Sequence, residues 1–306
     1  MWKTSVFRRV ALRPLHPEVL RSELFRWFML APSLVLLLGV SVIPLLYSAR
    51  ISLLSFRFGN PYKFVGLNNY IHLFRDLGFW HSLGITAVFT VVAVAIEFVL
   101  GLCLALLVAG NLRFKGLIRT AFMLPMVVTP VIVGITFRFI FTSDLGIVSY
   151  LTRIIFGKQF NFLSTPELAL PAVIIVNVWE WTSFMFLVLL AGLHSLPTEP
   201  FEAARVDGAS PWQIFRDITL PLLKPVILIA LLIRTMDAFT TFDSIFILTA
   251  GGPGTSTETV SLYVYNTAFQ FLQLGYAAAM VLVILVLLVL VSRLFIRLLG
   301  DEASAA

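Results

Sequence analysis

Residues 82–109 read Ser-Leu-Gly-Ile-Thr-Ala-Val-Phe-Thr-Val-Val-Ala-Val-Ala-Ile-Glu-Phe-Val-Leu-Gly-Leu-Cys-Leu-Ala-Leu-Leu-Val-Ala, with Glu97 as the single charged residue. A helix needs about 20 apolar residues to cross the roughly 30 Å hydrocarbon layer of a bilayer. The run is long enough to do so. It is continuously apolar, whereas the strands of a transmembrane β-barrel alternate apolar and polar residues. This segment therefore predicts a membrane-spanning helix.

The composition of the whole chain agrees with this interpretation. Of the 306 residues, 59% are hydrophobic and 12% are charged. Soluble domains average about 45–50% apolar and about 25% charged residues, so this chain has too little polar surface to face water on all sides. The same composition excludes a disordered chain, and a single cysteine excludes a disulfide scaffold.

Six runs of this kind predict an all-α integral membrane protein with six transmembrane helices. The expected spans are residues 27–49, 82–109, 119–141, 168–193, 222–248 and 273–296. In the expected domain organisation, residues 1–26 form a basic tail, 27–298 form the six-helix transmembrane domain, and 299–306 form a short second tail.

The distribution of basic residues predicts the orientation. Six spans place the N-terminal tail, the loops 110–119 and 194–224 and the C-terminal end with Arg293 and Arg297 on one side, and these regions hold fourteen Lys and Arg residues. Five lie on the other side: Arg57, Lys63, Arg75, Arg153 and Lys158. Because cytoplasmic loops carry the excess of basic residues, both termini are expected to be cytoplasmic.

Several enzyme signatures are absent from the sequence. It has no phosphate-binding Gly-x4-Gly-Lys-Ser/Thr loop, no Gly-x-Ser-x-Gly nucleophile elbow and no His-Glu-x-x-His zinc helix. The four histidines are scattered, and Cys103 stands alone in the second span. We therefore expect neither catalysis nor a bound cofactor or metal in this chain.

The loop 194–224 predicts two short helices with a sharp corner. Thr198 is expected to cap the first helix, and Gly208 to end it in a left-handed conformation. Ser210 followed by Pro211 begins the second, which should end before Pro221. An alternative interpretation is an amphipathic connector that lies on the membrane surface.

A spaced motif in this loop favours a more specific interpretation. Glu202-Ala203-Ala204, Gly208 and Ile218-x-Leu220-Pro221 follow the pattern E-A-A-x3-G-x9-I-x-L-P. The pattern resembles that of permease subunits of binding-protein-dependent ABC importers. Three further segments resemble the carbohydrate-type permeases, the group of maltose and glycerol-3-phosphate importers, and the resemblance covers about residues 27–298. These segments are residues 61–70, 234–243 and 248–259.

The resemblance implies a cytoplasmic coupling helix between the fourth and fifth spans, docked on a separate ATPase subunit that binds the ATP and Mg. The implied ATPase-coupling residues are Glu202, Ala203, Ala204, Asp207 and Gly208. It also implies three partners in a bacterial plasma (inner) membrane: a second permease subunit, expected to be a different chain, an ATPase dimer and an extracytoplasmic sugar-binding protein. No nucleic-acid partner is expected.

Polar residues at membrane depth are candidates for the substrate pathway. Asn177 lies about 14 Å into the fourth span, and Asn177, Glu180, Trp181 and Phe184 share one helix face. An amide, a carboxylate and aromatic rings suit a sugar. The alternative interpretation is that Asn177 and Glu180 hold helices together.

Other candidates have weaker support. Arg234 is expected to pair with Asp237 or with Glu97, because a buried cation needs a counter-ion. Pro125 and Pro130 should kink the third span. The remaining pathway candidates are Asp237, together with Asp144, Gly146 and Asp243 near the outer ends of the third and fifth spans.

Two alternatives remain. An ion-gradient-driven secondary transporter would use Glu97, Glu180 or Asp237 as its coupling carboxylates, but it leaves the 202–221 motif unexplained. The other is an ABC importer of glycerol phosphate or another small solute, of which glycerol phosphate would need basic pocket residues. The carboxylate of Glu180 therefore favours a neutral sugar.

Overall fold

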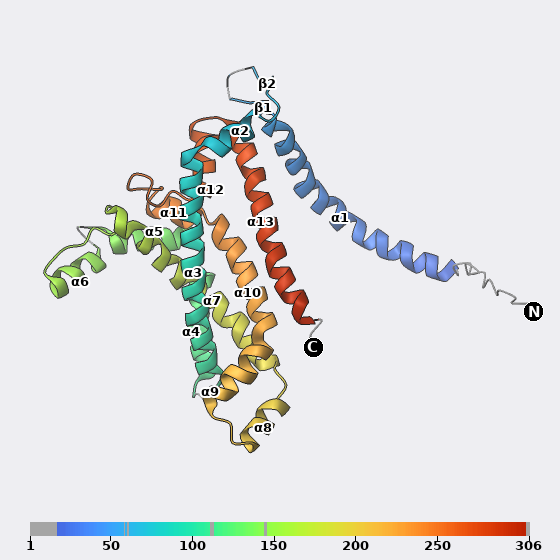
Figure 1. Cartoon of the computed structure of the whole chain (residues 1–306), viewed down its shortest axis with the longest axis vertical. Helices are drawn as coiled ribbons and strands as arrows, with labels where there is room; N and C mark the ends of the chain where they lie inside the picture. The colour runs from blue at the N-terminus through green and yellow to red at the C-terminus, as the bar shows by residue number, and fades with distance from the viewer. Residues whose placement is uncertain (1–16, 58, 60, 111–112, 144–145, 304–306) are drawn as a thin grey trace, which may run out of the picture.

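The computed structural model describes residues 17–57, 59, 61–110, 113–143 and 146–303, and within these ranges the chain is mainly helical (Figure 1). Five helical segments are long and apolar enough to cross a membrane, or six if one sharply bent pair counts as a single span. The long helices are α1 (Pro17–Ser52), α3 (Leu77–Ala109), α7 (Pro166–Ser195), α10 (Leu220–Thr240) and α13 (Leu274–Ala303).

The bent pair takes the place of the single kinked span expected over 119–141. The segment forms α4 (Lys115–Val127) and α5 (Pro130–Phe141), whose axes differ by 92°. Val128 and Thr129 between them are extended, with ψ of 134° and 141°. Proline disfavours the helical conformation in the residue before it, so Pro130 forces the break, whereas Pro125 stays inside α4. The predicted kink is therefore present.

Short elements lie at both ends of the bundle, and α6 projects to one side of it (Figure 1). We call the end that carries β1, β2 and α2 the hairpin end, and the opposite end the α8 end (Figure 1). The short elements are β1 (Leu54–Ser55), β2 (Lys63–Phe64), α2 (Asn68–Arg75), α6 (Ile147–Phe156), α8 (Glu199–Val206), α9 (Pro211–Ile214), α11 (Asp243–Leu248) and α12 (Val260–Tyr265), with the π-helical turns η1 (Phe215–Thr219) and η2 (Asn266–Gln270).

The core forms where α3, α7 and α10 pack. A Cβ atom added at Gly101 of α3 would lie 2.6 Å from Cβ of Met185 on α7, so only glycine permits this close approach. Phe89, Met185 and Phe186 are fully buried there. By contrast, α1 stands apart from the bundle over most of its length (Figure 1), and its apolar side chains from Phe28 to Leu46 are largely exposed.

The helix that begins at Pro211 does not end before Pro221, contrary to expectation. It continues through η1 into α10, so residues Pro211–Thr240 form one apolar helical segment. Proline lacks the N–H donor and its ring crowds the carbonyl one turn earlier in an α-helix. The wider π turn just before Pro221 accommodates this disruption, and the Thr219 hydroxyl donates to the carbonyl of Ile214, five residues earlier (3.2 Å).

Candidate functional site

Arg234 of α10 lies at the centre of the bundle and is 1% exposed. Its Nε donates to Oε2 of Glu97 on α3 (2.7 Å), and its Nη2 donates to Oε1 of the same carboxylate (2.9 Å). Glu97 is completely buried. This two-point contact, the strongest geometry for an ion pair between arginine and a carboxylate, joins α3 to α10.

Two more polar residues complete what we call the Arg234 cluster: Arg234, Glu97, Asn177 and Asp237. Nη2 also donates to Oδ1 of Asn177 on α7 (2.9 Å), and Nη1 donates to Asp237 one turn along α10. The Trp181 ring covers the guanidinium, with its centroid 4.5 Å from Cζ. Both predicted partners of Arg234 are therefore present, and the cluster connects α3, α7 and α10.

Glu180 lies one turn from Asn177 on α7 and is 2% exposed, yet no hydrogen bond or ion pair joins it to another described residue. Nδ2 of Asn177 is likewise buried without a hydrogen-bond partner. The single guanidinium faces three carboxylates, of which only that of Asp237 is substantially exposed. The surroundings of Glu180 therefore hold a donor and an acceptor that lack partners, and a hydroxyl-bearing ligand, which both donates and accepts, would satisfy them.

The other pathway candidates are not gathered at one point. Trp181 and Phe184 are half-buried neighbours on α7, with ring centroids 6.5 Å apart. Gly146 precedes α6, and an added Cβ would lie 2.3 Å from the carbonyl oxygen of Thr142, so only glycine fits this turn. Asp243 is exposed in the first turn of α11. Asp144 lies outside the described residues.

The segment 196–210, which we call the α8 loop, forms the predicted corner. Gly208 has φ of +76°, the left-handed conformation expected of a helix stop. The Ser210 hydroxyl and the Gln213 side chain form a reciprocal capping box at the start of α9. Thr198 occupies the N-cap position of α8, but its side chain makes no capping bond, because its backbone is already helical (ψ −27°). That part of the expectation is wrong.

The side chains of the α8 loop are largely exposed. Glu202, Ala203, Asp207 and Gly208 are exposed, and Ala204 is half-buried. Two large apolar side chains that were not singled out from the sequence are also exposed at this end: Val206 in the loop is 87% exposed, and Trp212 in α9, just after the loop, is 66% exposed. The sequence contains a signal for both, because large apolar residues in a polar segment between spans have no core to enter.

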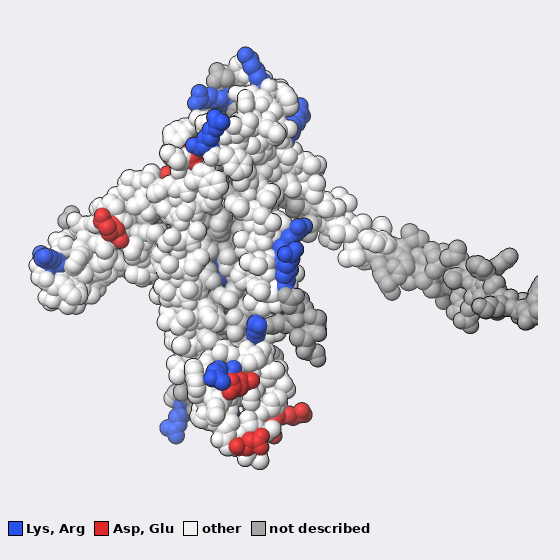
Figure 2. Space-filling model, viewed as in Figure 1, with Lys and Arg blue, Asp and Glu red and all other residues white. Residues whose placement is uncertain are grey.

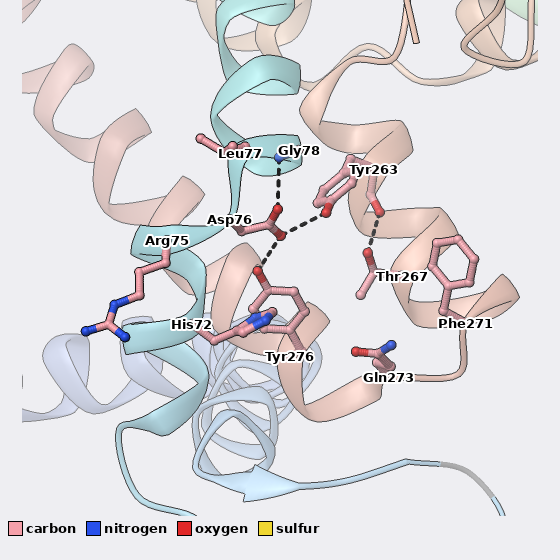
Figure 3. Close-up of a pocket in the computed structure, with 10 residues that line it drawn as sticks. All are labelled: His72, Arg75, Asp76, Leu77, Gly78, Tyr263, Thr267, Phe271, Gln273 and Tyr276. Atoms are coloured by element: carbon pink, nitrogen blue, oxygen red, sulfur yellow. Dashed lines mark hydrogen bonds between the residues drawn. The ribbon is translucent and has the colours of Figure 1, made fainter. Parts of the chain in front are cut away.

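A second polar cluster, not foreseen from the sequence, lies at the hairpin end (Figure 3). Oδ1 of Asp76 accepts from the backbone N–H groups of Gly78 (2.9 Å) and Phe79 (3.3 Å) and thereby caps α3. Oδ2 accepts from the hydroxyls of Tyr263 (2.8 Å) and Tyr276 (2.5 Å). Asp76, Tyr263 and Tyr276 form the Asp76 cluster, which ties the start of α3 to α12 and α13.

Burial and hydrogen bonding in the Asp76 cluster shift the pKa values of Asp76 and Tyr263. Burial raises the pKa of the Asp76 carboxyl, but hydrogen bonds from Tyr276, Tyr263 and the two N–H groups outweigh it, and the pKa lies below the ordinary value of 3.8. Burial, followed by the hydrogen bond to Asp76, raises the pKa of Tyr263 well above its ordinary value. Asp76 is therefore ionised throughout the neutral range.

Most of the residues described above lie in a region that matches a known protein family. Residues 97–302 match the family described as binding-protein-dependent transport system inner membrane component. The chain belongs to this family. The matched region begins at Glu97, so it contains the whole Arg234 cluster and the α8 loop of this transport-system component.

Similar proteins carry related descriptions. The transport-system component is 39% identical over 241 residues to the trehalose/maltose transport system permease protein MalF of Thermococcus litoralis, covering 78% of this chain and 82% of that protein. It is 35% identical over 303 residues to the trehalose transport system permease protein SugA of Mycobacterium tuberculosis, covering 98% and 94%. The fold matches a chain of a bacterial ABC transporter that imports the acidic polysaccharide alginate, with TM-score 0.81, 23% identity and coverage of 93% and 98%.

Replacing Asp76 with alanine is expected to destabilise this transport-system component. The change removes an α3 cap and leaves two tyrosine hydroxyls without their acceptor, a loss of about 1–3 kcal/mol. Because the native pKa of Asp76 lies below its unfolded value, its contribution is complete above about pH 4 and disappears as the pH falls through the native pKa. Thermal unfolding in detergent should show wild type and Asp76→Ala well separated at pH 7 and converging at strongly acidic pH. Asp76→Asn, which keeps one acceptor oxygen, should fall between them, and equal stability of all three at pH 7 would contradict this account.

Proposed function

We propose that this chain is the transmembrane permease subunit of an ATP-driven ABC importer that translocates a carbohydrate delivered by an extracytoplasmic binding protein. The α8 loop is the observation that carries the proposal. It exposes small and apolar side chains outside the apolar spans, and it leads directly into the helical segment Pro211–Thr240. The family match and the sugar permeases among the similar proteins support the same conclusion.

The α8 loop is proposed to dock on the ATPase subunit. The exposed methyl group of Ala203 lets α8 approach a partner closely, Glu202 offers a carboxylate to a basic residue of that partner, and Gly208 sets the angle between α8 and α9. Ala204 and Asp207 complete the docking contacts. ATP and Mg are bound by the ATPase, whose closure would draw the α8 loops of two permeases together.

The segment Pro211–Thr240 connects this docking surface to the membrane interior. It carries Arg234 and Asp237 near its far end, where the Arg234 cluster joins it to α3 and α7. A displacement of the α8 loop would therefore move the central polar residues together. Rocking of such a packed unit about a subunit interface exposes a pathway alternately to either side.

We place the α8 end in the cytoplasm, with both termini, and the hairpin end outside the cytoplasm. This orientation puts most loop Lys and Arg residues on the cytoplasmic side of a bacterial plasma membrane, which the chain crosses several times.

The substrate class is inferred from the pathway face and from relatives. Glu180, Trp181 and Phe184 offer an acceptor and aromatic rings at membrane depth, which suits sugar hydroxyls and their C–H faces. Trehalose and maltose, named for the relatives, are the first sugars to test. The remaining residues proposed for the pathway are Asn177, Asp144, Gly146, Asp237 and Asp243.

The proposed assembly also includes a second permease, an ATPase dimer and a sugar-binding protein. The exposed apolar length of α1 offers the second permease, expected to be a different chain, a contact surface inside the membrane. The structurally similar alginate transporter is described in complex with a periplasmic protein that holds an alginate pentasaccharide.

Reconstitution of the purified complex in liposomes tests the proposal. We expect an ATPase subunit to co-purify, and uptake of labelled trehalose or maltose to require ATP and a sugar-loaded binding protein. Uptake that proceeds without ATP and collapses with the ion gradient would overturn the proposal. That result would favour a secondary transporter that uses Glu97, Glu180 or Asp237. Uptake restricted to a phosphorylated solute would retain the importer and change its substrate.

A further inference from the structure

Two adjoining hollows form a groove at the hairpin end. The first, about 600 Å³, includes His72, Arg75, Asp76 and Phe271 in its lining (Figure 3). The second, about 250 Å³, lies against the hairpin and includes Arg57. Both share Gln273 and Tyr276 as a common wall, so the groove has one arginine in each half.

The groove is held in shape by contacts among its walls. Nδ2 of Asn69 on α2 donates to the carbonyl oxygens of Ser52 (2.7 Å) and Leu54 (3.0 Å). The N–H of Gly275 on α13 donates to the carbonyl of Phe56 (3.0 Å). A Cβ at Gly275 would lie 2.1 Å from the carbonyl oxygen of Leu54, so the hairpin rests directly on α13. A surface fixed in this way loses little conformational freedom when it binds a partner.

The groove carries a net positive charge, because two arginines line it against one aspartate. Arg57 and Arg75 are exposed, and neither forms an ion pair or hydrogen bond with another described residue. Asp76 is the one carboxylate among the residues that line the two hollows, and four donors already occupy its oxygens. Lys and Arg side chains gather over this end of the molecule in Figure 2. The groove therefore offers donors and aromatic edges to a ligand that supplies acceptors.

We infer that this groove docks an acidic surface of the extracytoplasmic binding protein. The inference rests on the proposed function, which brings such a protein to the hairpin end. The shape favours a protein surface over a small ligand. Both hollows are open, their free cations are exposed, and none of the buried polar atoms without a partner in the described residues belongs to a residue that lines them. Opposite charges across an interface accelerate encounter and select the partner.

The test uses the complete complex in lipid nanodiscs, with ATP hydrolysis measured against the concentration of its sugar-loaded binding protein. The double variant Arg57→Glu/Arg75→Glu should raise the half-saturating concentration at least about tenfold, because it replaces attraction with repulsion. Basal hydrolysis and the maximal stimulated rate should stay unchanged. Raising NaCl from about 50 to about 300 mM should weaken the wild type and have little effect on this variant.

Two controls separate local charge from other effects. Arg57→Lys/Arg75→Lys keeps both positive charges and should retain most of the wild-type affinity. Arg153→Glu/Lys158→Glu makes the same change in net charge at exposed residues of α6 and the turn after it, away from the groove, and should shift the half-saturating concentration much less. Unchanged basal hydrolysis reports that each variant is folded and assembled.

Four results would overturn the inference. The groove is not the docking surface if Arg57→Glu/Arg75→Glu behaves like wild type, or if the α6 control shifts equally. Binding of free trehalose or maltose to the complex, lost in the groove variant, would assign the groove to a small ligand. A wild-type complex that transports without any response to a binding protein would instead overturn the proposed function, and this inference with it.

Discussion

Arg234→Leu is expected to yield little folded protein. The substitution leaves Glu97 as a fully buried carboxylate without its cation. It also removes the hydrogen bonds from Arg234 to Asn177 on α7 and to Asp237 within α10. Removing one partner of a buried ion pair typically costs about 3–5 kcal/mol, a large part of the total stability of most domains. The yield of monodisperse protein in detergent and its thermal unfolding temperature should both fall sharply.

A compensating variant tests the cause. Glu97→Leu/Arg234→Leu removes both charges of the pair, and replacement of a buried ion pair by apolar residues is often close to neutral for stability. The double variant should therefore regain most of the lost yield and unfolding temperature. If the single variant is as stable as wild type, or the double variant is worse than the single, the two-point ion pair does not hold α3 and α10 together as described.

Gly208→Val is expected to reduce sugar uptake about tenfold or more while ATP hydrolysis continues. The φ of +76° at this corner is strongly unfavourable for a β-branched residue, so valine would redirect α8 relative to α9. Because no atom lies within 4 Å of an added Cβ, the effect comes from the backbone and not from a steric clash. The measurement is sugar molecules taken up per ATP hydrolysed in liposomes.

Matched substitutions isolate the backbone effect at Gly208. Asparagine tolerates the left-handed conformation, so Gly208→Asn should lose much less uptake than Gly208→Val. Gly116 in α4 also has open space around an added Cβ, but its φ lies outside the left-handed range. Gly116→Val should therefore keep the wild-type ratio of uptake to hydrolysis. Equal losses at both glycines would show that the corner at Gly208 has no special role in coupling.

The apolar spans and the α8 loop could be predicted because their signals are local. A long apolar run implies residence in the membrane whatever its neighbours are, and Gly208, Ser210 and Pro211 specify a corner by themselves. The direction of a span, by contrast, cannot be predicted from local signals alone. The prolines of the third span predicted a kink, but the 92° turn also depends on the extended backbone of Val128 and Thr129.

At Pro221 the local rules predicted the end of a helix that in fact continues. Local rules end a helix before proline, yet here a π turn carries the helix past it. The choice depends on whether the resulting long helix can pack against α3 and α7, as residues such as Leu223 do at Gly192. Tertiary contacts of this kind are not visible in a single sequence.

In the candidate site, too, the features set by local sequence signals could be predicted, and those set by contacts between distant residues could not. Helical periodicity placed Asn177, Glu180 and Trp181 on one face, and charge balance predicted that Arg234 would pair with Glu97 or Asp237. Periodicity did not reveal that Asn177 would bind Arg234, because the two residues are 57 positions apart. The Asp76 cluster was missed for the same reason, since Tyr276 follows Asp76 by 200 positions.

The separation of Glu97 and Arg234 along the chain has a consequence for biosynthesis. The two residues are 137 positions apart, and a ribosome adds about 5–20 residues per second, so roughly 7–27 s pass between their syntheses. If α3 enters the bilayer as it is made, its carboxylate has no guanidinium partner during that interval, and it must stay protonated or remain shielded by the insertion machinery. The nascent chain therefore acquires its central cross-link only when α10 has been inserted. Slowing translation between α3 and α10 would lengthen the period in which quality-control proteases meet an incomplete bundle.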